Sequence, residues 1–200
     1  QCRDNPHLGI RPGLWLRHFQ DVGRRDVFHL EPTVGGEPVG YATEATPAEL
    51  RLRCDEGCVR FCISDTHALR IRCEGVGLRL SMHAGLSAGE FELGRDAMRL
   101  NAAGTLHDFT FCRLAGDLTT RRAAMDDRKY VLVELAPTDD ESAAECIAIQ
   151  SKGQPELPPA WPSYEAVRDE AAESFERFHA AHAQVPEDLR AAGYLASYIN

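Results

Sequence analysis

The chain has 200 residues, of which 44% are hydrophobic and 26% are charged. This composition is that of a globular protein and excludes wholesale disorder. The formal net charge of -9 disfavours non-specific binding to nucleic acid or anionic lipid, because both require a cationic surface. No apolar stretch approaches the roughly twenty residues of a membrane-spanning helix, so the sequence predicts neither a nucleic-acid nor a membrane partner.

The cysteine content bears on the compartment. Seven cysteines are an odd number in a chain long enough to fold without disulfides, which favours reduced, buried thiols and a cytoplasmic location. The chain opens with Gln1, and a helical pattern is interrupted at Asn200. We therefore expect a segment of a longer protein.

The first three quarters of the chain alternate apolar and polar residues with the two-residue period of β-strands. Strands are predicted at residues 13–19, 26–30, 39–43, 50–54, 59–63, 69–73, 76–82, 98–102, 106–112, 130–136 and 146–150. Clean alternation means that one face is buried and the other solvated, as in antiparallel sheets. Short turns between many strands favour a sandwich or a barrel. We predict a mainly β protein with an antiparallel β-sandwich domain over residues 1–152.

One segment competes with this pattern. Thr46 to Glu49 has the form of a helix capping box with Pro47 at the first helical position. The alternation that begins at Glu49 predicts at most one helical turn there. Residues 138–141 repeat the ambiguity before the final strand.

Helical spacing replaces the alternation after Lys152. A linker over residues 153–162 is marked by Pro155, Pro158, Pro159 and Pro162. An apolar stripe follows at Tyr164, Val167, Ala171, Phe175, Phe178 and His182. Ser163 is a suitable N-cap, and Glu165 suits the first turn. Pro186 ends this helix and can open a second one, with its own stripe at Leu189, Ala192, Ala196 and Ile199. Residues 163–200 are thus predicted to be two helices whose stripes need a covering surface.

Two patterns could carry catalysis. Gly85 to Gly89 reads G-x-S-x-G, the pattern of a serine nucleophile elbow, but the required helix is not predicted after it, so a turn is favoured. Cys54, Cys58 and Cys62, with His67 and Cys73 nearby, could hold a metal or form a thiol site. Their C-x3-C-x3-C spacing differs from compact zinc knuckles, so free buried thiols are favoured over a metal or one disulfide.

The remaining candidates also have simpler interpretations. Glu176 and His179, with His182, resemble half of a di-iron motif, but histidines near a helix end also suit the helix dipole. Acidic runs at 126–127 and 139–141 are expected to be solvated loops. Aromatic residues could stack on sugars but are expected to serve packing: Trp15, Tyr41, Trp161 and Tyr164. No residue is assigned as catalytic or metal-binding, the substrate-binding residues stay unknown, and no cofactor is predicted.

The order of elements resembles the N-terminal region of bacterial six-hairpin glycosidases. The features that carry the resemblance are the β-rich domain, the proline linker, the amphipathic helix and the segment Leu189-Arg-Ala-Ala-Gly-Tyr-Leu-Ala-Ser-Tyr-Ile-Asn200. The relatives in question are similar to processing α-glucosidase, mannosylglycerate hydrolase and amylo-α-1,6-glucosidase. In them a β-supersandwich and a linker helix precede an (α/α)6 catalytic barrel, and residues 194–200 look like the first barrel helix.

This resemblance implies a non-catalytic accessory domain of a glycoside hydrolase. Its partner would be the (α/α)6 catalytic domain of the same chain, which would hold the acid and base carboxylates beyond residue 200, and an oligo- or polysaccharide is a possible ligand. A loop at residues 35–39 could shape the substrate entrance. Two alternatives stay open, namely a stand-alone glycan-binding module and a thiol- or metal-dependent protein that uses the region from Cys54 to Cys73.

Overall fold

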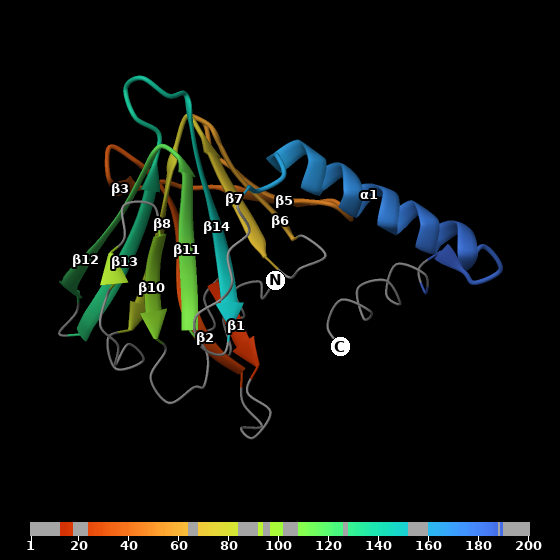
Figure 1. Cartoon of the computed structure of the whole chain (residues 1–200), viewed down its shortest axis with the longest axis horizontal. Coiled ribbons are helices and arrows are strands. Elements are labelled where there is room, and N and C mark those ends of the chain that lie inside the picture. Colours follow the sequence, from red (N-terminus) through yellow and green to blue (C-terminus); the bar gives the residue numbers. More distant parts are fainter. Residues whose placement is uncertain are drawn as a thin grey trace.

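The chain folds into two antiparallel β-sheets followed by one α-helix (Figure 1). A computed structural model describes residues 13–17, 24–63, 68–83, 92–93, 97–101, 108–125, 128–151, 160–187 and 189. The predicted fold class, a mainly β sandwich followed by a helical segment, is confirmed.

The first sheet has six strands. Their order is β1 (Gly13–Arg17), β2 (Arg24–Val34), β8 (Gly77–His83), β13 (Arg128–Ala136) and β12 (Asp117–Met125), with β3 (Glu37–Pro38) paired to β2. The second sheet has eight strands, in the order β4 (Ala42–Ala45), β5 (Leu50–Arg53), β6 (Cys58–Ile63), β7 (Leu69–Glu74), β14 (Ala143–Ser151), β11 (Asp108–Ala115), β10 (Ala97–Asn101) and β9 (Glu92–Leu93).

The main core lies between the sheets and is built from alternate residues of each strand. It includes Val59 and Phe61 of β6, Ile71 and Cys73 of β7, and Phe111 of β11. The intervening residues of the same strands form the outer face of the eight-stranded sheet, because successive side chains point to opposite faces. This alternation agrees with the sequence pattern and decides which side chains meet the helix.

Most predicted strands are present, with shifted ends. The strand expected at residues 39–43 lies later, at β4, because the amide of Val39 donates to the carbonyl of Pro32 beside the β2–β3 turn. Strand β12 was not predicted, because its polar and alanine-rich sequence, DLTTRRAAM, lacks a large apolar stripe. It pairs with β13 along its full length at the edge of its sheet.

The capping-box segment forms a turn instead of a helix. The hydroxyl of Thr46 accepts a hydrogen bond from the amide of Glu49 at 3.1 Å, as a capping residue would, but β5 begins at Leu50. The amide of Thr46 also donates to the carbonyl of Glu49 at 2.8 Å. The turn fixes the position of Glu49 at the start of the strand.

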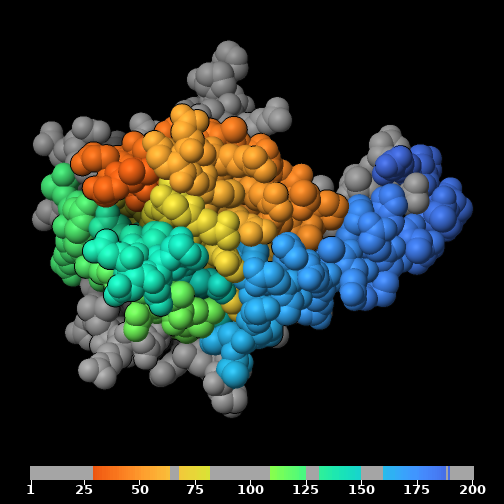
Figure 2. Space-filling view, turned by 90° about the horizontal axis from the view of Figure 1, so that it is seen from above, coloured from red at the N-terminus to blue at the C-terminus, as the bar shows by residue number. Residues whose placement is uncertain are grey.

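Helix α1 (Tyr164–Ala181) begins as the sequence predicts. The Ser163 hydroxyl accepts from the amide of Ala166 at 3.1 Å, and Glu165 lies in the first turn. Only the first half of its apolar stripe is fully buried, at Tyr164, Val167 and Ala171. The helix begins against the eight-stranded sheet and then extends away from the sandwich (Figures 1 and 2). Among the described residues, no helix is both long and apolar enough to cross a membrane.

Most of the second predicted helix and three of the four linker prolines lie outside the described residues. Residue 189 is described and its side chain is 58% exposed. The proposed bounds of the sandwich, linker and helical segments therefore stay predictions.

Candidate functional site: a polar junction between sheet and helix

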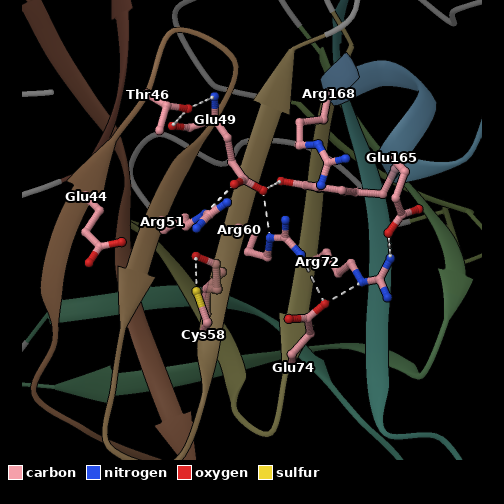
Figure 3. Close-up of polar contacts among 12 residues, drawn as sticks. Glu44, Thr46, Glu49, Arg51, Cys58, Arg60, Arg72, Glu74, Glu165 and Arg168 are labelled. Atoms are coloured by element: carbon pink, nitrogen blue, oxygen red, sulfur yellow. Dashed lines mark hydrogen bonds and ion pairs between the residues drawn. The ribbon is translucent and has the colours of Figure 1, made fainter. Parts of the chain in front are cut away.

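A cluster of charged side chains joins the outer face of the eight-stranded sheet to the start of α1 (Figure 3). We call this cluster the polar junction. Its members come from the turn before β5, from β5, β6 and β7, and from the first turn of α1: Glu49, Arg51, Arg60, Arg72, Glu74, Tyr164 and Glu165.

The strand register places three arginines side by side across the sheet. Arg51 of β5 is opposite Arg60 of β6, and Arg60 is in turn opposite Arg72 of β7. Like charges directly opposite each other on neighbouring strands are destabilising. This row therefore needs anions between its members and on the helix that covers it.

Glu49 supplies the central anion. Its side chain is only 1% exposed, and its carboxylate accepts from Nε of Arg60 at 2.7 Å, from the Tyr164 hydroxyl at 2.9 Å, and from Nε of Arg51. Burial on its own would raise the pKa of Glu49, but these three hydrogen bonds hold that pKa below its usual value. The carboxylate is thus ionised and accepts hydrogen bonds on both oxygens.

Tyr164 joins the helix to this anion. The residue is 1% exposed. Burial raises the pKa of the phenol far above its usual value, and the neighbouring Cys62 thiol and the hydrogen bond from the phenol to Glu49 raise it further. The guanidinium carbons of Arg60 and Arg72 lie 5.2 Å and 5.9 Å from the ring centroid, which is cation–π geometry. One side chain of α1 therefore contacts two members of the arginine row as well as Glu49.

Two more carboxylates complete the pairing of Arg72. Glu74 is ion-paired with Nε of Arg72 at 2.9 Å and accepts a hydrogen bond from Nη1 of Arg60 at 3.4 Å. Glu165, in the first turn of the helix, accepts from Nη1 of Arg72 at 2.7 Å. Glu49 and Glu74 thus lie between the arginines along the sheet, and Glu165 pairs with Arg72 from the helix (Figure 3).

A second attachment lies before the helix starts. Arg70 is buried and donates to the carboxylate of Glu145 and to the carbonyl of Pro162. Trp161 packs against a small apolar cluster on the same outer face, made of Ala68, Cys112 and Ile147. The segment before α1 is therefore held to the sheet by the backbone carbonyl of Pro162 and by the side chain of Trp161.

An open hollow of about 260 Å³ lies beside the junction. It is lined by Arg51, Arg53, Cys54, Gly57, Cys58, Arg60 and Glu74. The hollow is polar and shallow, unlike the largely apolar pockets that enclose organic substrates.

The junction has the chemistry of an attachment rather than of a catalytic centre. A general acid or base needs a pKa tuned toward the working pH and access to a substrate. Glu49 has a lowered pKa and no exposed oxygen, and the Tyr164 phenol is buried with a raised pKa. Structural ion-pair networks perturb pKa values in the same manner.

The cysteines of the predicted thiol or metal region are free thiols on both faces of the sheet. Cys73 lies in the main core and Cys54 packs against it, whereas Cys62 contacts Tyr164 and Val167 on the outer face. Burial raises the pKa of Cys54, Cys58, Cys62 and Cys73, to about 11 at Cys62. Raised pKa values oppose thiolate chemistry. Among the described residues no three His, Cys, Asp or Glu side chains are grouped to hold a metal, and His67 lies outside them.

The aromatic candidates serve packing where their side chains are described. Tyr164 is buried, Trp161 is half-buried on the outer face of the sheet, and Tyr41 packs against the main core. Trp15 lies in β1, with its side chain outside the described part. Three of the four aromatic side chains therefore pack against the protein, and only Tyr164 among them is fully buried.

The structure does not gather the other candidate residues from the sequence, where they are described, into one site. On their own helix, the ring of His179 is tilted against Phe175 at a centroid distance of 4.8 Å, and His182 stacks on Phe178 at 4.2 Å. Glu141 accepts from the amide of Gly116 at 2.5 Å and so joins the β13–β14 connection to the β11–β12 turn. Residues 35–39 form the β2–β3 turn and the stretch after it. Residues 85–89 and 126–127 lie outside the described residues.

Sequence reasoning missed every charged member of the junction as a site residue. The alternation assigned Glu49 and the arginines to a solvated face, and a helix covers that face. One signal was available, because arginine recurs at that face in three successive predicted strands, at Arg51, Arg60 and Arg72. A row of like charges on neighbouring strands indicates that acidic residues lie close by.

No protein-family model matches the chain, and no curated protein matches it. Solved structures that match include one described as "Putative kojibiose phosphorylase from human microbiome", with a TM-score of 0.42 and 9% sequence identity. The match covers 78% of this chain and 28% of that chain, so the present chain spans little more than a quarter of that protein. A TM-score this low establishes neither a shared fold nor a shared activity.

Proposed function

We propose that this chain is a non-catalytic accessory domain of a carbohydrate-active glycoside hydrolase, and that it holds helix α1 in a fixed orientation toward an α-helical catalytic domain. The observation that carries the proposal is the polar junction. Glu49 and Tyr164, 115 residues apart in sequence, are hydrogen-bonded at the point where the helix leaves the sheet.

The burial pattern of α1 supports a connecting role. Tyr164, Val167 and Ala171 are buried at the sandwich end, whereas Phe175 and Phe178 in the second half are only half-buried. A helix that is fixed at one end and extends beyond its own domain transmits the orientation of that domain to whatever packs on its other end. Apolar side chains on the extending half suit packing against further helices.

The carbohydrate-active class rests on the order of elements. A β-sandwich, a proline-containing segment and a linker helix follow one another as in the six-hairpin glycosidases that the sequence resembles. In such an arrangement the catalytic carboxylates belong to the helical domain. The sandwich would contribute no reacting group, in agreement with the saturated, low-pKa carboxylate of Glu49.

Glycosidase assays on two proteins test this proposal. The 200-residue chain should hydrolyse no α-linked oligosaccharide above background, whereas the same chain extended by its natural downstream sequence should be active. In the extended protein, Glu49→Gln should lower activity without altering the catalytic carboxylates. Turnover by the 200-residue chain alone would contradict the proposal.

A titration separates this proposal from a stand-alone glycan-binding module. Oligosaccharides added to the 200-residue chain should leave its tryptophan fluorescence unchanged. Saturable quenching that is lost in Trp15→Ala would favour the binding module instead.

A further inference from the structure

The hollow beside the polar junction presents guanidinium groups that are only partly used. Arg60 contacts Glu49 through Nε and Glu74 through Nη1, and Arg51 contacts Glu49 through Nε. Arg53 is ion-paired through Nε with Glu44 at 2.8 Å. These contacts run through Nε of Arg51 and Arg53 and through Nε and Nη1 of Arg60, so they leave the other guanidinium nitrogens unused.

The charge of the lining favours an anion. Three arginines and one glutamate line the hollow, and that glutamate, Glu74, already contacts Arg60 and Arg72. Glu49 does not line the hollow, and both of its carboxylate oxygens accept hydrogen bonds. The Arg53–Glu44 pair is about half exposed on both sides, so solvent and salt weaken it and a competing anion can displace it.

The size of the hollow limits the anion to a small one. About 260 Å³ of open space is less than the roughly 300–1,000 Å³ that enclose drug-sized ligands. Guanidinium groups recognise oxyanions through paired N–H donors, and three of them suit an ion with several oxygens.

We infer that this hollow binds a small dianionic oxyanion of the sulfate or phosphate type through the terminal nitrogens of Arg51, Arg53 and Arg60. The site is independent of the proposed function, because all three arginines lie on β5 and β6 and binding needs no further domain. Anion binding is a role separate from the attachment of the helix, because it uses guanidinium nitrogens that the contacts within the junction leave unused.

A nuclear magnetic resonance titration of the 200-residue chain with sodium sulfate, at constant ionic strength, tests the inference. The amide signals of Gly57 and Cys58, which line the hollow, should shift and saturate. Arg53→Gln should weaken binding about tenfold, as expected for the loss of a hydrogen bond to a charged group. Arg53 is the suitable site because its side chain is 57% exposed and it does not contact the helix.

Arg168→Gln is the matched control. Arg168 is ion-paired with Asp169 on α1 at 2.6 Å, outside the hollow, and the variant should bind sulfate as the parent does. The inference is overturned if sodium acetate produces the same shifts at equal ionic strength, or if Arg53→Gln binds sulfate as tightly as the parent.

Discussion

The phenolic oxygen of Tyr164 lies 2.9 Å from a carboxylate oxygen of Glu49, and this hydrogen bond connects the first turn of the helix to the turn before β5. Both side chains are about 1% exposed. A buried carboxylate is stable only with enough donors, so the helix is a structural requirement of the sheet face that it covers.

Tyr164→Phe should destabilise the protein by roughly 1–3 kcal/mol, because Glu49 loses one buried donor. The ring would still lie beside Arg60 and Arg72, so the cation–π contacts remain. Tyr164→Leu removes both the hydroxyl and the ring and should cost more. Urea unfolding measures both free energies, and equal stability of Tyr164→Phe and the parent would contradict the role given to the hydroxyl.

Glu49→Gln should cost roughly 3–5 kcal/mol at neutral pH, since it leaves Arg51 and Arg60 without their buried counter-charge. Because the folded-state pKa of Glu49 is lowered, its contribution is present above the usual carboxyl value of 4.5 and is lost as the pH falls through the lower folded value. The parent should lose this stability on acidification, whereas the variant should change less over the same range.

Glu134→Gln is the matched comparison for that experiment. Glu134 lies between Arg79 at 2.8 Å and Arg121 at 2.9 Å on the other sheet, and its pKa is also lowered, chiefly by the hydrogen bond from Arg121. Its side chain is 24% exposed, so the substitution should cost distinctly less than Glu49→Gln. An equal loss in the two variants would show that burial does not distinguish Glu49.

Gly116→Ala should be far more destabilising than Gly35→Ala. Both glycines have positive φ angles, +71° and +58°, at which an L side chain is strained by about 1 kcal/mol. At Gly116 a Cβ would also lie 2.4 Å from Cβ of Ala144 and 2.6 Å from the carbonyl oxygen of Ala136, whereas at Gly35 nothing lies within 4 Å. Thermal unfolding of the two variants makes the comparison, and similar melting temperatures would be inconsistent with this packing.

The strands could be predicted because the alternation of apolar and polar residues indicates which side chains face the core. Val59 and Phe61, for example, are core residues as their spacing indicates. The start of α1 could be predicted because the capping role of Ser163 is local in sequence. Strand β12 could not, since its pairing with β13 depends on backbone groups and not on an apolar stripe.

The sequence indicates only the arginines of the polar junction, and the contacts that complete it could not be predicted for a different physical reason. The alternation correctly places Arg60 and Arg72 off the core face, but the same pattern describes a solvated face and a face covered by a helix. Only the fold brings Tyr164 over that face, where it contacts Glu49 and both arginines. Long-range contacts between polar residues, such as that of Glu49 with Tyr164, do not produce a repeating pattern of residues in the sequence.

The two halves of α1 should differ in amide hydrogen exchange. Val167 packs against Cys62 of the sandwich and Ala171 is also buried, whereas the half from Glu173 onward has only exposed or half-buried side chains. Local opening is less costly where fewer side chains are buried. Exchange should therefore be slower in the first half, and uniform protection along the helix would contradict attachment at one end.

The central claim, that the junction fixes the helix on the sandwich, is tested most directly by the distance distribution between two spin labels. One label would replace exposed Arg177 on the second half of α1 and the other exposed Thr119 on β12, introduced by chemistry that spares the native cysteines. We predict a single narrow distribution that broadens in Glu49→Gln. A broad distribution in the parent chain, or one that Glu49→Gln leaves unchanged, would contradict the claim.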